Sequence, residues 1–358
     1  MNNHIEQWVR PEIRALSAYH VPDPGDMIKL DAMENPYPWP EELRQEWLEL
    51  LAGVDVNRYP DPQASDLKDR LRANMGIPKD AGLILGNGSD ELIQMLAMTV
   101  AAPGRAVLSV DPGFVMYRMI ATFCGMDYLG VPLHEEDFSL DIDALLNAIE
   151  QHQPALIFLA YPNNPTGNLF PEDALMQVIG KAPGLVVIDE AYAPFTDHSF
   201  MSRAGEFDNL LVMRTVSKMG LAGLRLGYLA GPDFWLNEID KTRLPYNINV
   251  LTQLSTEFAL RHQAVFNQQT QMIREERGRL YQSLLELNGV IPYPSEANFI
   301  LLRCLNRPAT ELFEVLKTQG VLVKNLHGAH PILDQCLRIT VGTAQENSAF
   351  IQALRKAL

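Results

Sequence analysis

The sequence of 358 residues has few cysteines and shows no metal-binding pattern. Its three cysteines, Cys124, Cys304 and Cys336, lack C-x-x-C spacing, which argues against a disulfide framework or a zinc site. We therefore expect buried thiols in a reducing compartment, and a cytoplasmic protein. His327 and His330 form an H-x-x-H pair without a third ligand close by in the sequence, so we expect no metal.

Positive charge and long hydrophobic runs are also scarce. Acidic residues outnumber basic ones by 44 to 29, giving a net charge of −15, so neither nucleic acid nor an anionic membrane is an expected partner. No apolar run approaches the ~18 residues that can span a membrane, and the first ten residues lack the apolar core of a signal peptide. The length and the hydrophobic content of 47% predict a globular protein of about two domains.

The middle of the chain alternates short apolar runs with amphipathic segments. This alternation predicts an α/β fold, whose larger domain has a mostly parallel sheet flanked by helices, including helices at 142–150 and 172–179. Ligands of such sheets gather at the carboxyl ends of the strands. The runs that we interpret as strands are Leu83–Leu85, Ala106–Val110, Leu156–Ala160, Leu185–Ile188, Leu210–Met213 and Leu226–Ala230.

The two ends of the chain differ from this centre. Residues 1–40 are rich in proline and cannot form a long helix, so we expect an arm that lies over the body or over a partner. A large domain, 41–250, should begin with a helix at 41–52, and a long helical region, roughly 250–287, should link it to a small α+β domain, 251–358. In the small domain we expect strands at Phe299–Leu302, Val321–Lys324 and Cys336–Val341, and helices at 309–318 and 344–357, the last opened by a Thr343–Glu346 capping box.

A turn after the strand Leu210–Met213 presents Ser217 and Lys218, followed by Arg225 among glycines and small apolar residues. A partly desolvated lysine loses its proton more easily and becomes a nucleophile. A hydroxyl and an arginine beside it can bind a phosphate. Pyridoxal 5′-phosphate is a cofactor that combines an aldehyde with a phosphate. Taken alone, the Ser-Lys pair is more typical of an ordinary surface turn, but other strand ends supply matching groups.

Polar side chains follow the neighbouring strands. Asp189 ends a buried strand, where a carboxylate needs a positive partner such as a pyridinium nitrogen; a metal site or a loop start is the alternative. Asn164, in a rigid loop, and Tyr192 can reach the cofactor phenolate oxygen and lower the pKa of the nitrogen that links lysine to cofactor. Phe114 can stack on the ring or belong to the core.

Glycines precede a predicted helix at Gly86-Asn87-Gly88-Ser89-Asp90-Glu91. Such a loop leaves backbone N–H groups and the helix dipole to bind an anion. Ser89 and Asp90 are therefore candidate phosphate ligands, and capping of the helix is the alternative.

Together these motifs resemble those of fold-type I pyridoxal-phosphate enzymes of the aminotransferase group, most specifically the histidinol-phosphate aminotransferases. The resemblance extends from Tyr19 to the C-terminus. It rests on short motifs in a fixed order, namely Arg58 to Asp61, Gly88 to Glu91, Tyr161 to Gly167, Asp189 to Tyr192, Thr215 to Lys218, Leu221 to Arg225 and Leu337 to Gly342.

The resemblance implies transamination between glutamate and imidazole-acetol phosphate, giving L-histidinol phosphate, in a homodimer with shared sites. Lys218 would bind the cofactor covalently and transfer the proton, and Tyr59 would reach the phosphate of the neighbouring subunit. Arg338 would grip the substrate anion, or be a surface ion-pair residue. Tyr19 and Glu34 would lie near the substrate, or be solvated loop residues.

Two positions depart from the family pattern. Phe114 stands where members of the family often have tyrosine, so it keeps the aromatic ring that can stack but lacks the hydroxyl. Lys324 stands where members of the family often have arginine. A lysine offers a point charge, whereas an arginine guanidinium can bind an anion through two parallel hydrogen bonds. The alternatives on the same scaffold are an aromatic amino acid aminotransferase and a threonine-phosphate decarboxylase.

Overall fold

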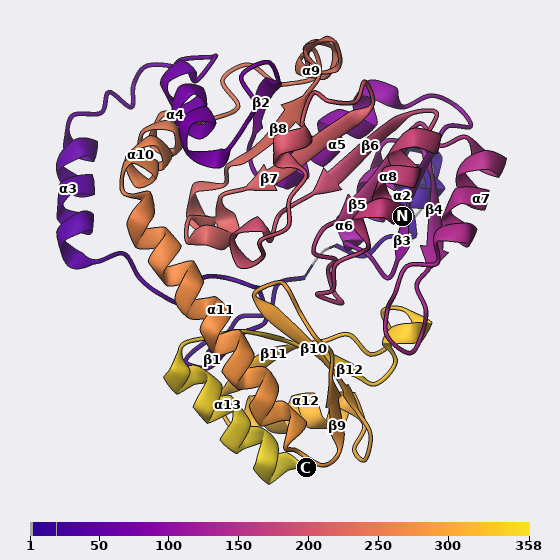
Figure 1. The fold of residues 1–358 in the computed structure, drawn as a ribbon, viewed down its shortest axis with the longest axis vertical. Coiled ribbons are helices and arrows are strands. Elements are labelled where there is room, and N and C mark those ends of the chain that lie inside the picture. The colour runs from indigo at the N-terminus through magenta and orange to yellow at the C-terminus, as the bar shows by residue number, and fades with distance from the viewer. Residues whose placement is uncertain (1–2, 19) are drawn as a thin grey trace.

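The computed structural model describes residues 3–18 and 20–358, and it contains two β-sheets, one above the other in Figure 1. The larger sheet has the strand order β2-β8-β7-β6-β5-β3-β4, and the smaller has the order β1-β11-β12-β10-β9. The strands of the larger sheet are β2 (Gly82–Gly86), β3 (Ala106–Asp111), β4 (Asp127–Pro132), β5 (Leu156–Ala160), β6 (Leu185–Asp189), β7 (Leu210–Thr215) and β8 (Gly227–Gly231).

Helices cover both faces of the larger sheet (Figure 1), which explains why its strands are apolar without interruption. Along β6, Leu185 and Val187 belong to a cluster with α5, α6 and α9, whereas Val186 and Ile188 belong to one with α4, α7 and α8. The helices of this part are α3 (Glu41–Ala52), α4 (Ser65–Met75), α5 (Ser89–Val100), α6 (Val115–Phe123), α7 (Ile142–His152), α8 (Glu172–Lys181), α9 (Asp233–Asp240) and α10 (Val250–Arg261).

Strand β8 departs from the expected parallel arrangement, because it is antiparallel to both β7 and β2. Only residues 216–226 connect β7 to β8. A parallel neighbour requires a crossover of a dozen or more residues, usually with a helix. The loop that carries Ser217, Lys218 and Arg225 is therefore a short reversal at one edge of the sheet, and all three side chains stay close to the end of β7.

The smaller sheet includes a strand from the proline-rich arm that the sequence did not reveal. β1 (Ile28–Leu30) pairs in parallel with β11 (Val321–Asn325). Three residues are too few for a periodic signal, and the partner strand lies at the other end of the chain. The expected strands β10 (Phe299–Cys304), β11 and β12 (Cys336–Thr340) are present, and β9 (Val290–Pro292) completes the sheet.

Helices α11 (Gln263–Leu285), α12 (Ala309–Thr318) and α13 (Ala344–Ala357) accompany the smaller sheet. α11 runs from the larger sheet down to the smaller one, where α13 lies beside it (Figure 1). The Thr343–Glu346 capping box is confirmed. The long helical region is divided at His262, the single residue between α10 and α11. In the arm, α1 (Asn3–Trp8) and α2 (Pro11–Arg14) are short helices.

Two properties of the surface and the interior follow from the sequence. Cys304 and Cys336 are buried free thiols, as expected, whereas Cys124 is only half-buried. Within residues 3–18 and 20–358, no helix is both long and apolar enough to cross a membrane.

Candidate active site

A cavity of about 370 Å³ lies where the carboxyl ends of β5, β6 and β7 meet the loop after β7. Such an edge is the usual ligand site of an open α/β sheet. The cavity brings together most of the residues that the sequence singled out. Its lining includes Glu34, Ser89, Asp90, Phe114, Asn164, Asp189, Tyr192, Ser217, Lys218 and Arg225.

Lys218 occupies a 3-10 helix, Ser217–Met219, that begins two residues after β7 ends. Its Nζ donates to the carbonyl oxygen of Ala32, 3.4 Å away, and lies 5.9 Å from the centre of the Tyr192 ring. Burial, followed by the charge of Arg338, lowers the pKa of Lys218 to about 8, although Glu34 opposes the shift. A substantial fraction of this amine is therefore neutral near physiological pH, as a nucleophile requires.

Asp189 is the last residue of β6 and is 3% exposed. Burial raises the pKa of its carboxyl to about 6, although hydrogen bonds from the Tyr117 hydroxyl and the Ala191 N–H oppose the shift. The Tyr117 hydroxyl donates to Asp189 Oδ2 over 2.6 Å, and the Ala191 N–H donates to Oδ1 over 3.1 Å. A buried carboxylate held in this way is suited to a positive group placed in the cavity.

Asn164 links the two sheets through its side-chain amide. Its Nδ2 donates to the Tyr192 hydroxyl at 3.0 Å, and its Oδ1 accepts from Arg338 at 2.7 Å. Arg338, on β12, also donates to the carbonyl oxygen of Asp31 at 3.1 Å. Arg338 is buried, with 7% exposure, and is not the surface ion-pair residue that the sequence left as an alternative.

The loop between β2 and α5 packs closely against β8. Gly88 has φ +84°, and a Cβ there would come within 2.6 Å of an Arg225 nitrogen. A Cβ on Gly227 would come within 2.7 Å of the Ser89 nitrogen. Gly88 is the N-cap of α5, so Ser89 and Asp90 are its first helical residues and face the cavity instead of capping the helix.

Hydroxyl and charged groups gather around the start of α5. Arg225 contacts Asp90 Oδ2 at 3.4 Å, and the hydroxyls of Ser217 and Thr215 lie 2.8 Å apart. Backbone N–H groups at a helix start, together with hydroxyls and an arginine, are typical phosphate ligands.

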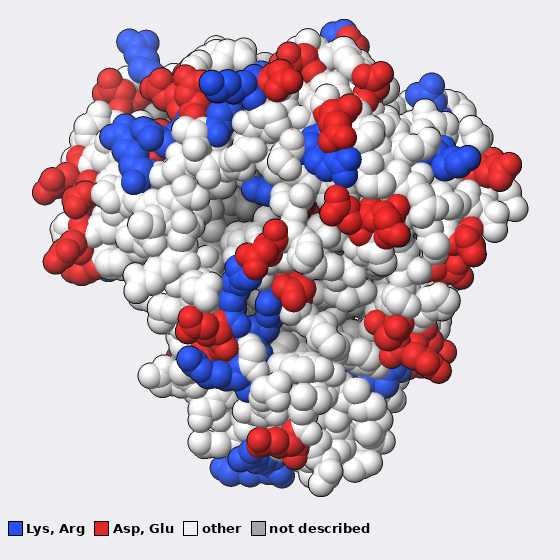
Figure 2. Space-filling model, viewed as in Figure 1, with Lys and Arg blue, Asp and Glu red and all other residues white. Residues whose placement is uncertain are grey.

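A second cavity, of about 660 Å³, adjoins the first through shared Met33, Phe114 and Asn164. It holds the two predicted substrate cations of the smaller sheet, Lys324 and Arg338. Their Cα atoms face each other across β11 and β12. Figure 2 shows acidic and basic side chains mixed over one face of the molecule, and a hollow between its upper and lower parts.

The remaining predicted residues are placed differently. Tyr59 is 79% exposed and stacks on Tyr246 with ring centres 4.3 Å apart, away from the cavity of its own chain. Glu34 lines the cavity and forms an ion pair with Lys29. Tyr19 lies outside the described residues. Within the described part of the chain, no group of three or more His, Cys, Asp or Glu residues could hold a metal ion.

Three contributors were not identified from the sequence. Tyr117 bonds Asp189 from α6, a helix whose start at Val115 carries no strong signal. Thr215 lines the cavity and belongs to a motif that was noted for other residues. The Ala32 carbonyl that accepts from Lys218 is a backbone group, and no side-chain pattern could have revealed it.

The cavity fits pyridoxal 5′-phosphate, because a buried amine, a buried carboxylate and a phosphate-binding helix start line the same space. The group that these residues define is the pyridoxal-phosphate-dependent enzymes of fold-type I. A family model described as "Aminotransferase class I and II" matches residues 25–354. The chain belongs to the class I and II aminotransferases, and within them to the histidinol-phosphate aminotransferase family, and its cofactor is pyridoxal 5′-phosphate.

Curated relatives match almost the whole chain. A histidinol-phosphate aminotransferase 2 from Nitrosococcus oceani is 55% identical over 99% of this chain and 98% of its own length. A histidinol-phosphate aminotransferase from Chromobacterium violaceum is 53% identical over 98% of each chain. The predicted family, enzyme class and cofactor are thereby confirmed.

Solved structures share the fold. The histidinol-phosphate aminotransferase from Sinorhizobium meliloti, solved in complex with pyridoxal-5′-phosphate, has a TM-score of 0.86 at 23% identity and covers 98% of this chain and 97% of its own. An L-threonine-O-3-phosphate decarboxylase from Porphyromonas gingivalis also matches, with a TM-score of 0.77 at 21% identity, covering 92% of this chain and 98% of its own. The fold-type I prediction is confirmed, and the fold alone does not separate these activities.

Proposed function

We propose that this protein transfers the amino group of glutamate to imidazole-acetol phosphate, giving L-histidinol phosphate and 2-oxoglutarate, in histidine biosynthesis. The observation that carries this proposal is the 55% identity, over 99% of the chain, to a histidinol-phosphate aminotransferase. The threonine-phosphate decarboxylase alternative is supported only by a shared fold at 21% identity. An aromatic amino acid aminotransferase is the other alternative on this scaffold.

In this proposal Lys218 binds the cofactor aldehyde covalently and moves the proton at the reacting carbon. When bound, the cofactor supplies an electron-accepting ring that stabilises charge developing on that carbon. Asp189 holds the ring nitrogen protonated by ion pairing, and its burial at 3% exposure strengthens that pairing. Asn164 and Tyr192, whose polar atoms lie 3.0 Å apart, would both donate to the phenolate oxygen, and Phe114, which lines the same cavity, would stack on the ring.

The cofactor phosphate is held by Ser89, Asp90, Ser217 and Arg225. Asp90 is an acid, so its role is to position Arg225 through their 3.4 Å contact and to present its backbone N–H. Ser89 and Ser217 offer hydroxyl donors, and Arg225 offers charge.

The active unit in this proposal is a homodimer in which Tyr59 reaches the phosphate of the neighbouring subunit. Tyr59, Val56 and Leu244 are each more than 70% exposed, and the stack of Tyr59 on Tyr246 joins their two segments into one apolar surface. Exposed apolar clusters of this kind mark protein–protein contacts. The proline-rich arm suits draping over the same neighbour.

Arg338 and Lys324 bind the substrate anion in the 660 Å³ cavity. Glutamate presents carboxylates and histidinol phosphate presents a phosphate, and an arginine fork can bind either. Glu34, which lines the adjoining 370 Å³ cavity, would contact the substrate, and the family resemblance implies the same role for Tyr19. The Arg338 contacts with Asn164 and the Asp31 carbonyl orient the guanidinium of this residue, which lines the cavity.

The domain division also belongs to this proposal. We divide the chain into an arm, 1–40, a large domain, 41–250, and a small domain, 251–358, with α10 and α11 as the link. The parallel pairing of β1 with β11 ties the arm to the small domain.

The free thiols Cys304 and Cys336 support the proposal that the protein works in a reducing compartment, the cytoplasm.

A substrate panel tests the reaction. The purified chain is assayed with L-histidinol phosphate, phenylalanine, tyrosine and threonine phosphate, each with 2-oxoglutarate as acceptor. We expect kcat/KM for histidinol phosphate to exceed the other values by at least about tenfold, which corresponds to ~1.4 kcal/mol in the transition state. A higher value for an aromatic amino acid, or release of carbon dioxide from threonine phosphate, would reject the assignment.

A further inference from the structure

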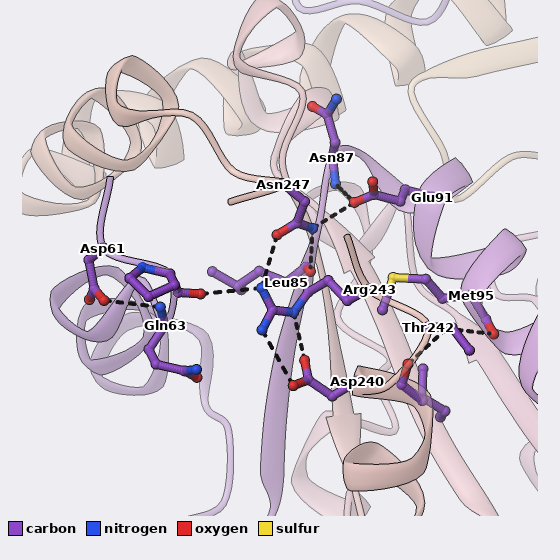
Figure 3. Close-up of polar contacts among 12 residues, drawn as sticks. Asp61, Gln63, Leu85, Asn87, Glu91, Met95, Asp240, Thr242, Arg243 and Asn247 are labelled. Carbon is purple, nitrogen blue, oxygen red and sulfur yellow. Dashed lines mark hydrogen bonds and ion pairs between the residues drawn. The ribbon is translucent and has the colours of Figure 1, made fainter. Parts of the chain in front are cut away.

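A polar cluster behind the phosphate loop connects segments that the proposed site uses on two sides (Figure 3). Glu91, in the first turn of α5, accepts the backbone N–H of Asn87 at 2.6 Å. The same oxygen, Oε2, accepts from Asn247 Nδ2 at 2.7 Å, and Asn247 Nδ2 also donates to the Leu85 carbonyl at 3.2 Å. Asn247 and Glu91 thus hold the backbone on both sides of Gly86, directly before Ser89.

Arg243 extends the cluster to the turn that carries Tyr59. Its Nε donates to Asp240 at 2.6 Å, which fixes the guanidinium. Its Nη1 then donates to the carbonyl of Pro62 at 3.2 Å and to Asn247 Oδ1 at 3.3 Å. Asn247 is therefore bonded to Arg243 through its oxygen and to Glu91 through its nitrogen.

The turn itself is closed by Asp61. Its carboxylate accepts from the Gln63 N–H at 3.0 Å and from the Ser65 N–H at 2.8 Å, as Figure 3 shows in part. The Tyr59 ring stacks on Tyr246, the residue before Asn247. Hydrogen bonds thus run without interruption from the Tyr59 turn to the phosphate loop.

We propose that Arg243, Asn247 and Glu91 form a positioning relay that couples the phosphate loop of one subunit to the Tyr59 that serves the other. None of these three side chains is among the residues that line the 370 Å³ cavity, so they act through the backbone of residues 86–90 and through the turn. The inference rests on the proposed function only in assigning the phosphate to this loop and Tyr59 to the neighbouring site. A single relay then affects two phosphate contacts, one in each subunit.

The first experiment compares pyridoxal 5′-phosphate with pyridoxal, which lacks the phosphate. Asn247→Ala removes the donors to Glu91 and Leu85 and the acceptor for Arg243. Because the loop then loses its fixed geometry, we expect the Kd for pyridoxal 5′-phosphate to rise about tenfold, the effect of one or two hydrogen bonds. The Kd for pyridoxal should change by less than about twofold, because the lysine and the ring contacts remain.

Two further variants sharpen this comparison. Asn74→Ala is the matched control, since Asn74 likewise bridges two segments, with bonds of 2.9 Å to Leu260 and 2.7 Å to Gln263, but has no contact with the loop. It should leave both Kd values unchanged. Glu91→Gln keeps an oxygen that can accept from the Asn87 N–H, so it should raise the Kd for pyridoxal 5′-phosphate by only about threefold. If the Asn247→Ala protein does not fold, Glu91→Gln takes its place in the comparison. Equal weakening of both ligands by the variant used would show a merely structural role and overturn the relay.

The second experiment tests the coupling between subunits in hybrid dimers. One subunit carries Lys218→Ala, so only the other keeps a covalently held cofactor. Asn247→Ala is then placed in either subunit, and release of cofactor is followed by its absorbance. Faster release in both arrangements is expected; faster release only when the change lies in the lysine-bearing subunit would overturn the coupling. A chain that binds cofactor normally but does not act on histidinol phosphate would reject the proposed reaction and leave both experiments valid.

Discussion

The hydroxyl of Tyr117 donates a 2.6 Å hydrogen bond to Oδ2 of Asp189, and both side chains are buried. The two residues are 72 positions apart in the sequence and meet because the Tyr117 ring, on α6, stacks on Phe158 of β5 and brings its hydroxyl to the end of β6. The bond stabilises the ionised carboxylate, and so it supports the charge that the proposed ring contact requires.

Tyr117→Phe should therefore weaken the ion pair without abolishing the site. We expect kcat to fall roughly threefold to tenfold, the effect of one hydrogen bond to a charged group. The pH at which the cofactor absorbance changes should shift in the same variant. Tyr293→Phe is the control, because its hydroxyl accepts from Arg303 at 2.9 Å, at a contact that does not involve Asp189. Equal losses in the two variants would contradict a specific role for Tyr117.

Asp189→Asn should separate stability from catalysis. Burial raises the pKa of Asp189 to about 6, so the cofactor-free protein should lose stability as the pH rises from about 4 to about 6, where the folded state resists ionisation. An asparagine side chain does not ionise, so the variant does not lose this stability as the pH rises. Above pH 6 its cofactor-free form should therefore melt at an equal or higher temperature than the parent. The loaded variant should keep some cofactor and lose most of its rate. Near-normal single-turnover rates would show that Asp189 has another role.

Lys218 should determine the pH dependence of cofactor capture. Burial and Arg338 lower the pKa of Lys218 to about 8. The rate at which the cofactor-free protein binds pyridoxal 5′-phosphate should therefore rise with pH and level off above about 8, since only the neutral amine reacts. Glu34→Gln should move this midpoint to lower pH, because Glu34 raises the pKa of Lys218.

Lys218→Ala should abolish turnover, and mass spectrometry after borohydride reduction should find the cofactor on Lys218 and on no other lysine.

Arg338→Lys tests how the substrate anion is bound. The change keeps the charge but loses the planar fork, so kcat/KM should fall by at least about tenfold, or ~1.4 kcal/mol. The two half-reactions, with glutamate and with histidinol phosphate, should be measured separately and should slow together. If only the glutamate half-reaction slows, the phosphate is held elsewhere, and Lys324→Met becomes the next variant to test.

Shared sites can be tested by mixing two inactive proteins. A Tyr59 variant that has been shown to be strongly impaired is combined with Lys218→Ala under conditions in which subunits exchange. Hybrid dimers should recover activity, because one of their two sites then has an intact Lys218 and an intact Tyr59. Verified hybrids without activity would show that the two residues do not serve complementary sites in different subunits.

The α/β order and most of the residues that line the cavity were predictable from the sequence. Apolar strands such as Leu156–Ala160 and Leu185–Asp189 are local patterns, and parallel strands bring their carboxyl ends to one edge. The sequence therefore predicts that Asn164, Asp189 and Lys218 lie together. The Thr343–Glu346 capping box was equally predictable, because all of its atoms lie within one helical turn.

Features that depend on contacts between distant segments could not be predicted from the sequence. The three-residue strand β1 became visible only through its pairing with β11, and the short 216–226 loop made β8 antiparallel. The Arg338–Asn164 bond joins positions 174 apart, and the Asn247–Glu91 bond joins positions 156 apart. Such bonds leave no periodic pattern in the chain, because the free energy that selects them comes from packing two separately formed surfaces against each other.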